Sequence, residues 1–220
     1  MAPREVLSDA ARLYGKRQSV RISAHAAGGV DVARRIEAAE AVDVVVLASD
    51  AIAKLVDAGK LLAEGRVDLM TSGIAIAVRT GAIHPCVADE DAVKEAVLAA
   101  ASLSYSTGPS GIYLVRLFEK WGIGAAIRKR LVVPQPGVPV AQLIANGDVA
   151  LGFQQMSELM NAPDVEVVGP MPQSIQLTTT FTAAITPACA DRYVAGHFLA
   201  FLASTETEAI KQLHGMTPIA

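Results

Sequence analysis

The segment Tyr105–Tyr113, which reads Tyr-Ser-Thr-Gly-Pro-Ser-Gly-Ile-Tyr, restricts the possible folds more than any other part of the chain. The mostly apolar residues 99–103 before it are typical of a short strand, and the apolar side chains after it recur at the spacing of an amphipathic helix. A strand, a turn rich in glycine and hydroxyl groups, and a helix therefore follow one another. This order is typical of α/β folds.

The turn supports two interpretations. The N–H groups at a helix N-terminus and the hydroxyls of Ser106, Thr107 and Ser110 suit a bound anion, and Gly111 carries no side chain that would block its approach. Alternatively, the turn only caps the helix, with Ser110 as an ordinary capping residue. The local sequence leaves both interpretations open.

Two earlier segments repeat the order of strand, turn and helix. Residues 20–24 alternate between apolar and polar side chains as a strand does, and Gly28 and Gly29 then open a helix. In the segment 43–47, Asp43 leads into a continuous apolar run that is typical of a strand buried on both faces, and Ser49 follows at the start of another helix. We therefore expect polar turns at the carboxyl ends of strands, where ligands bind in open α/β sheets.

Breaks in this pattern divide the chain into two lobes. Gly81 and Pro85 interrupt the chain after the strand-like residues 74–78, and residues 177–185 form a run long enough to cross between lobes. We predict two α/β lobes, the second inserted into the first, with a ligand cleft between them. The predicted bounds are residues 1–80 and 182–220 for lobe 1 and 81–181 for lobe 2, with crossings near 79–85 and 177–183.

The composition excludes several classes of protein. Apolar residues make up 52% of the 220 residues and the net charge is −3, so no basic field exists that would hold nucleic acid or an anionic membrane. No run reaches the ~18–20 apolar residues of a membrane span, and the N-terminus shows no apolar signal core. From the sequence alone we expect a cytoplasmic protein, or a mature or truncated form of an exported one.

The cysteines and most of the histidines give no sign of a metal site. Cys86 and Cys189 have no neighbours at metal-ligand spacing, so we interpret both as small apolar residues and leave their pairing open. His84, His197 and His214 show no such spacing either. We expect neither a metal nor a cofactor.

With these motifs in this order, the chain resembles the type II periplasmic substrate-binding proteins, closest to the molybdate-binding branch, which also includes aconitate isomerase-like proteins. The resemblance covers nearly the whole length. It implies a two-lobed α/β fold in which each lobe is a mostly parallel sheet flanked by helices. The motifs that carry it are Gly28-Gly29 before a helix, Val42-Asp43-Val44 leading to Ala48-Ser49-Asp50, Gly108–Tyr113 and Ala145–Phe153.

The resemblance also implies ligand contacts. Molybdate binders hold their oxyanion with hydroxyls and backbone N–H groups, and by position these contacts fall near Ser49, Ser110, Val138 and Gln155. Gln155 stands where molybdate binders commonly have tyrosine. Met1 opens almost directly into the first helix, whereas the family begins with a strand and a serine-bearing loop. We therefore expect a small oxyanion or carboxylate as the ligand.

Two functions compete on this fold. The first is a binding protein that clamps a small anion and hands it to an ABC-transporter permease, which by resemblance would act in the periplasm. The second is a cofactor-independent isomerase of an unsaturated tricarboxylate, similar to aconitate isomerase, and a ligand-sensing domain is a third alternative. The candidate ligand-binding residues are Gly28, Gly29, Ser49, Ser72, Arg79, Ser106, Thr107, Ser110, Gly111, Val138, Gln155 and Thr179.

An isomerase also needs one group that removes and returns a proton. The candidates are His25, Tyr113 and Glu158, and each has a structural alternative. His25 can be satisfied by backbone groups at a strand end, Glu158 can be a solvated carboxylate at a helix start, and Tyr113 can simply pack. Arg79 would supply an ionic partner for a carboxylate of the ligand.

Overall fold

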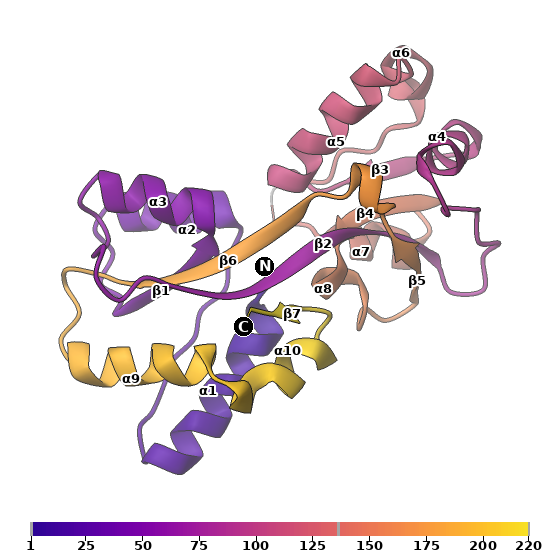
Figure 1. Ribbon diagram of the computed structural model, residues 1–220. Coiled ribbons are helices and arrows are strands. Elements are labelled where there is room, and N and C mark those ends of the chain that lie inside the picture. Colours follow the sequence, from indigo (N-terminus) through magenta and orange to yellow (C-terminus); the bar gives the residue numbers. More distant parts are fainter. Residues whose placement is uncertain (1, 136, 220) are drawn as a thin grey trace. The chain divides into compact units, whose positions relative to one another are not determined.

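The computed structural model describes residues 2–135 and 137–219, which form two compact units (Figure 1). Unit 1 comprises Met1–Ser72 and Thr179–Ala220, and unit 2 comprises Gly73–Thr178. Helices and strands follow one another along both units, as predicted for an α/β fold.

The chain changes unit inside or beside strands. The first change falls between Ser72 and Gly73, within β2 (Val67–Arg79), which is earlier than the crossing expected near residues 79–85. The apolar residues 74–78 are buried and pair with strands of unit 2, so β2 continues unbroken to Arg79. The return falls between Thr178 and Thr179, where β6 (Thr178–Ile185) begins.

The elements of unit 1 are the first part of β2, most of β6, and the following: α1 (Arg4–Gln18), α2 (Gly29–Glu37), β1 (Val44–Ala48), α3 (Ser49–Asp57), α9 (Arg192–Ala203), η3 (Thr205–Thr207), α10 (Glu208–Leu213) and β7 (Thr217–Pro218). Those of unit 2 are the second part of β2 and the following: α4 (Glu90–Ala99), β3 (Leu103–Tyr105), α5 (Pro109–Lys120), α6 (Gly124–Ile127), η1 (Arg128–Arg130), α7 (Val140–Asn146), β4 (Leu151–Gln155), α8 (Met156–Leu159), β5 (Val165–Pro170) and η2 (Gln173–Ile175). None of the helices in the described ranges is long and apolar enough to span a bilayer.

In unit 1, β6 lies between β1 and β2 (Figure 1). β1 is antiparallel to β6, with Val44 opposite Ile185, and β7 is antiparallel to β2. Val45 and Leu47 of β1 join one apolar cluster, whereas Val44 and Val46 pack against another. The continuous apolar run therefore belongs to a strand covered on both faces, as predicted.

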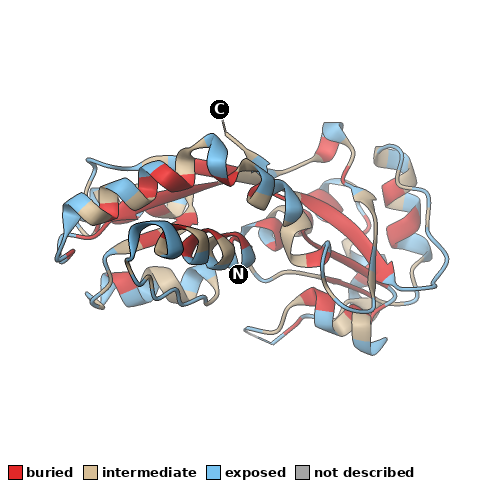
Figure 2. Ribbon diagram, turned by 90° about the horizontal axis from the view of Figure 1, so that it is seen from below, coloured by how far each residue is buried: buried red, intermediate tan, exposed pale blue. Residues whose placement is uncertain are grey.

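In unit 2, β2 is antiparallel to both β4 and β5, and β4 is parallel to β3. The described sheets are thus mixed in direction, whereas the expectation was a mostly parallel sheet in each lobe. Two long strands that return antiparallel beside the others account for the difference. Buried residues follow the strands and one side of the helices (Figure 2).

Residues 20–24, predicted as a strand, are not in one. Val20 and Ile22 are half-buried while Arg21 and Ser23 are exposed, so the alternation exists, but no strand of the described residues pairs with this segment. An extended segment without a hydrogen-bonded neighbour does not form a strand. The helix before it, α1, continues through Gly15 to Gln18 and is followed by its C-cap Ser19, whose φ of 54° is left-handed.

Candidate functional site

The ends of two strands of unit 2 and the bridge residue Leu131 lie at one edge of its sheet. β3 and β4 are parallel and in register, with Tyr105 opposite Phe153, and Leu131 forms a parallel bridge with Leu103. The residues that follow these segments therefore leave the sheet at the same edge. We call this the serine edge, and its predicted ligand-binding residues are Ser106, Thr107, Ser110, Gly111, Val138 and Gln155.

The N-terminus of α5 differs from those of α4 and α9, each of which has an aspartate cap. Asp89 and Asp191 cap α4 and α9 by accepting from Ala92 N and Val194 N at 2.9 and 3.0 Å. The N-cap of α5 is Gly108, which has no side chain to offer, and the first turn contains no acidic residue. The interpretation that Ser110 caps this helix is therefore wrong, because Ser110 lies inside the first turn. The positive end of the helix dipole is available to an anion.

Ser106 and Ser110 form a hydroxyl pair at this helix end. Their Oγ atoms are 2.7 Å apart, Ser106 is half-buried and Ser110 is 3% exposed. When one hydroxyl donates to the other, the accepting hydroxyl keeps its own proton for a third group. The pair can thus donate one hydrogen bond to an anion. Thr107 is exposed beside them.

Gly111 is required by a close approach of the backbone. A Cβ atom at this position would lie 1.6 Å from the carbonyl oxygen of Ser106 and 2.8 Å from its carbonyl carbon. The first turn of α5 therefore packs directly onto the backbone that carries Ser106. This contact sets the spacing of the two serines.

Gln155 and Val138 complete the serine edge. Gln155 is the last residue of β4 and is 7% exposed. Val138 precedes α7, and its N–H donates to Gln135 O at 3.0 Å.

Glu158, the candidate for proton transfer, follows on α8 and is half-buried. Burial raises the pKa of Glu158, and a hydrogen bond from the Gln154 side chain opposes this shift. Half-burial distinguishes Glu158 from a fully solvated carboxylate, and groups that transfer protons often have a shifted pKa, so Glu158 stays a candidate for proton transfer.

Gln154 is a residue of this region that the sequence analysis missed. Its Oε1 accepts from Ala141 N at the start of α7 at 3.1 Å, and its amide bonds to Glu158. Successive strand residues point to opposite faces, so Gln154 and Gln155 serve different sides of β4. The sequence signal that could have identified Gln154 is the pair of adjacent glutamines at the end of a buried strand.

Tyr113 has a structural role. Its hydroxyl donates to Ile175 O at 2.8 Å and so ties α5 to η2. Burial, with a smaller effect from Glu90, raises the pKa of Tyr113 above its ordinary value. A phenol that stays protonated and is committed as a donor is poorly suited to accept a proton, which favours the packing alternative.

The candidates Gly28, Gly29 and Ser49 lie in unit 1. Gly28 is the N-cap of α2, Gly29 is its first residue, and Ser49 is the first residue of α3. Both helices lack a side-chain cap, but each has an aspartate in its first turn, and Asp31 Oδ2 lies 3.4 Å from the position of a Cβ at Gly28. These two carboxylates already interact with the positive ends of the two helix dipoles.

The remaining ligand candidates occupy the two long strands. Ser72 is buried on β2, two residues before Ile74, which is opposite Gln155, and Thr179 follows at the start of β6. Arg79 is not brought to the serine edge. It ends β2 near Gly147, which precedes β4, and is therefore separated from Gln155 by the length of that strand. The structure gives the serine edge no arginine from this position.

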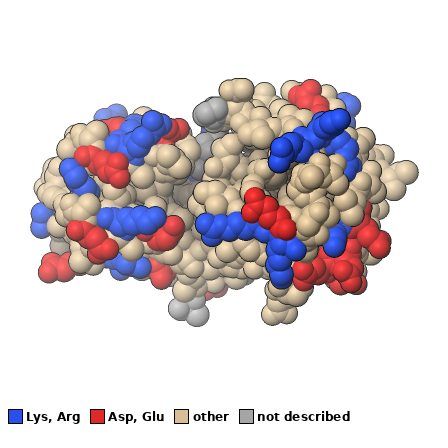
Figure 3. Space-filling view, turned by 90° about the horizontal axis from the view of Figure 1, so that it is seen from above, with Lys and Arg blue, Asp and Glu red and all other residues tan. Residues whose placement is uncertain are grey.

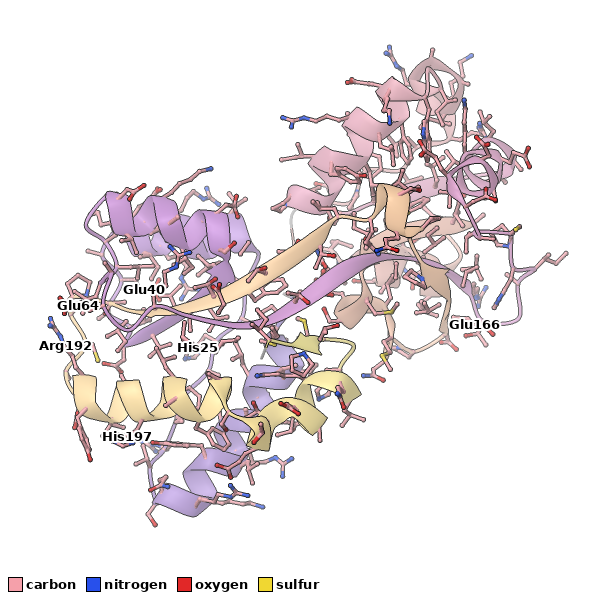
Figure 4. All side chains as sticks on the ribbon, in the orientation of Figure 1. His25, Glu40, Glu64, Glu166, Arg192 and His197 are labelled. Atoms are coloured by element: carbon pink, nitrogen blue, oxygen red, sulfur yellow. The ribbon has the colours of Figure 1, made fainter. Side chains whose placement is uncertain are left out.

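The histidines fall in four different environments. His25 Nε2 lies 3.4 Å from Ser23 Oγ, and its charge contributes to lowering the pKa of Glu40, which is set first by Arg35 (Figure 4). Glu40 lies beyond the C-terminal end of α2, so His25 is near that end. His84 Nε2 lies 3.3 Å from Glu166 Oε1, His214 Nε2 lies 3.0 Å from Asp9 Oδ2, and His197 stacks on Tyr193.

No group of three or more metal-binding side chains exists within the described residues. Cys86 is exposed and Cys189 is buried, and both are free thiols. On the face shown in Figure 3, basic and acidic side chains are interspersed over the surface. Selectivity for an anion at the serine edge would therefore come from local donors.

Known proteins resemble this chain in sequence. A family model described as bacterial extracellular solute-binding protein matches residues 1–217. An aconitate isomerase from Pseudomonas sp is 32% identical over 221 residues, which cover 97% of this chain and 83% of that protein.

Solved structures share the fold. The periplasmic molybdate-binding protein of Azotobacter vinelandii matches with a TM-score of 0.81 at 17% identity, over 100% of this chain and 96% of that one. The substrate binding domain of a putative molybdenum ABC transporter from Clostridium difficile matches with a TM-score of 0.77 at 15% identity, over the same shares. The predicted resemblance is confirmed. Because the family model spans residues 1–217 of 220, the chain belongs to the bacterial extracellular solute-binding proteins.

Proposed function

We propose that this solute-binding protein holds a small oxyanion or carboxylate at the serine edge of unit 2. The observation that carries the proposal is the N-terminus of α5, which has neither a side-chain cap nor an acidic residue and carries the Ser106–Ser110 hydroxyl pair. Backbone N–H groups, one available hydroxyl proton and the helix dipole all favour negative charge there. The relatives named for molybdate and aconitate point to the same ligand class.

In a transport role, the loaded protein would deliver its ligand to an ABC-transporter permease outside the cytoplasm. This form of the proposal needs no catalytic group. It predicts binding of a tetrahedral oxyanion such as molybdate, tungstate or sulfate.

A thermal-shift screen with molybdate, tungstate, sulfate, citrate, and cis- and trans-aconitate tests the ligand class. A ligand at a hundred times its dissociation constant stabilises by about 2.7 kcal/mol, which corresponds to roughly 5–10 °C for a chain of this size. Ser110→Ala removes a donor to the charged ligand and should weaken binding roughly 10- to 100-fold. Ser174→Ala changes an exposed serine of the same unit and should leave binding unchanged. Equal affinity of the two variants would refute the proposed site.

The second candidate function is isomerisation of an unsaturated tricarboxylate. The aconitate isomerase relative favours it, and so does Glu158, whose raised pKa and position at the end of β4 suit proton transfer beside the serine edge. In that reaction a carboxylate at Glu158 would remove a proton from one carbon and return it to another, while the hydroxyl pair holds a carboxylate of the substrate.

Glu158→Gln tests this role. The amide keeps the size of the side chain but cannot exchange a proton, so interconversion of cis- and trans-aconitate should fall at least about 100-fold while aconitate still binds. Rates can be followed by the ultraviolet absorbance of the two isomers. A variant that isomerises aconitate at the unchanged rate would remove Glu158 from the mechanism, and a wild-type protein that binds only oxyanions would remove the isomerase.

A further inference from the structure

The side-chain amide of Gln176 forms a bidentate clamp on the backbone of Ile74. Gln176 Oε1 accepts from Ile74 N at 2.8 Å, and Gln176 Nε2 donates to Ile74 O at 3.0 Å and to Met171 O at 3.4 Å. An amide has the same donor and acceptor pair as a peptide group. The side chain thus takes the place of a neighbouring strand just where β5 ends at Pro170, a residue without an N–H.

The clamp lies opposite a candidate ligand-binding residue. Both backbone groups of Ile74 are directed toward residues 171–176, since Ile74 O also accepts from Met171 N at 2.9 Å. Ile74 is in register with Gln155 across the antiparallel pair of β2 and β4. The two residues therefore form a non-hydrogen-bonded pair, in which side chains approach most closely, with about 4.5 Å between Cα atoms.

The glycine next to the clamp leaves room for it. A Cβ at Gly73 would lie 2.8 Å from Gln176 Nε2 and 3.0 Å from its Cδ. Gly73 is also the first residue of unit 2, and Gln176 is two residues before the chain returns to unit 1. The clamp therefore joins the two linking segments immediately inside unit 2.

We propose that Gln176 is a positioning residue: through Ile74 it fixes the middle of β2, where the pairing with β4 begins, and so holds Gln155 in place at the serine edge. The ligand part of this inference rests on the proposed function. Gln176 itself does not contact the ligand. Its amide acts on the backbone of Ile74, and the effect reaches Gln155 through the strand pair.

Gln176→Glu is the sharpest test. The carboxylate places a second negative oxygen against the carbonyls of Ile74 and Met171, which need donors. This repulsion moves the side chain off Ile74, so that Ile74 N also loses its acceptor. Gln173→Glu, in the same short segment and exposed, adds the same charge without touching Ile74 and is the matched control.

The first readout needs no ligand. Hydrogen exchange at the Ile74 amide should accelerate about tenfold or more in Gln176→Glu and stay unchanged in Gln173→Glu. The difference from the wild-type protein at the same pH should shrink as the pH falls from 8 to 5, because the two carbonyl oxygens raise the pKa of the introduced carboxyl group and its protonated form again donates to Ile74 O. Unchanged exchange at Ile74 in Gln176→Glu would overturn the clamp.

The second readout is the dissociation constant for molybdate, citrate and trans-aconitate on the full chain. For whichever probe binds the wild-type protein, Gln176→Glu should bind about tenfold more weakly or worse, with the same recovery at low pH. Lost protection at Ile74 with unchanged affinity would overturn the positioning role. If the wild-type chain binds none of the probes, the proposed function and the ligand part of this inference are both overturned. Hydrogen exchange at Ile74 then still tests whether Gln176 clamps this backbone.

A second variant covers the case in which Gln176→Glu does not fold. Gly73→Ala introduces no charge and moves the flexible Gln176 amide off Ile74, so it should reproduce the faster exchange at Ile74 and the weaker binding. Normal exchange in Gly73→Ala would contradict the proposal.

Discussion

We expect Gly111→Ala, which adds one methyl group, to destabilise unit 2 more than Gly73→Ala or Gly108→Ala does. The new Cβ would lie 1.6 Å from Ser106 O, and the atom it meets belongs to the backbone and cannot rotate away. Overpacking of this kind costs 1–3 kcal/mol in ordinary cores, and we expect about 3 kcal/mol or more here. For a chain of 220 residues this corresponds to a loss of roughly 6–12 °C in Tm.

Gly108→Ala is the matched control in the same turn. A Cβ at Gly108 would lie 3.9 Å from Ser106 Oγ, which is an ordinary contact, and its φ of −86° suits any residue. Its Tm should stay within about 2 °C of the wild-type value, because substitutions without a clash or a lost contact usually change stability by less than about 0.5 kcal/mol. Similar melting temperatures for the two variants would contradict the observed packing of α5 on Ser106.

Lys211→Met should stabilise unit 1. Lys211 is 1% exposed, and its Nζ is buried without a hydrogen-bond partner in the described part of the structure. A buried polar group without a partner costs roughly 1–3 kcal/mol, whereas methionine has a similar length and no such cost. We expect a gain of about 2 kcal/mol at pH 7, or roughly 4–8 °C in Tm.

The gain should depend on pH in a defined direction. Burial lowers the pKa of Lys211 from the ordinary value of 10.5, and the charge of Glu208 partly opposes this shift. The unfolded chain then holds the proton more tightly than the folded chain, so wild-type stability rises with pH between the folded pKa and 10.5. The advantage of Lys211→Met should therefore be largest at and below the folded pKa and shrink as the pH approaches 10.5.

Thermal unfolding of both proteins from pH 7 to 10.5 measures this difference. Lys16→Met, which changes an exposed lysine of the same unit, should show neither the gain nor its pH dependence. A loss of stability in Lys211→Met, or a gain that stays constant with pH, would mean that the ammonium group is paired in the folded protein.

Local patterns in the chain predicted much of the secondary structure. The apolar run that follows Asp43 predicted β1, and the pair Gly28-Gly29 before an amphipathic run predicted the start of α2. Such features depend on neighbours within a few residues, for which periodicity and capping chemistry are direct signals. Residues 20–24 show the limit of this reasoning, because alternation describes a strand while only a hydrogen-bonded neighbour makes one.

The composition of the serine edge was also visible in the sequence, but its geometry was not. Ser106, Ser110 and Gln155 were predicted as ligand-binding residues, and the parallel register of β3 and β4 places them at one edge. The antiparallel register of β2 and β4 places Arg79 at the opposite end of β4, which its position in the sequence did not indicate. A residue type is a local property, whereas the edge at which it emerges depends on strand direction and register, which long-range pairing sets.

The clamp from Gln176 to Ile74 joins residues 102 positions apart, and nothing near either residue in the sequence predicts it. The bond between Gln154 and the start of α7 arises in the same way, and so does the lack of a partner for Lys211 Nζ among residues 2–135 and 137–219. In each case the side chain gains or loses its partner only when distant segments pack together. The chain alone thus specifies the elements and the chemical character of the turns, and the tertiary structure decides which donors and acceptors meet, because hydrogen bonds act over about 3 Å of space regardless of sequence distance.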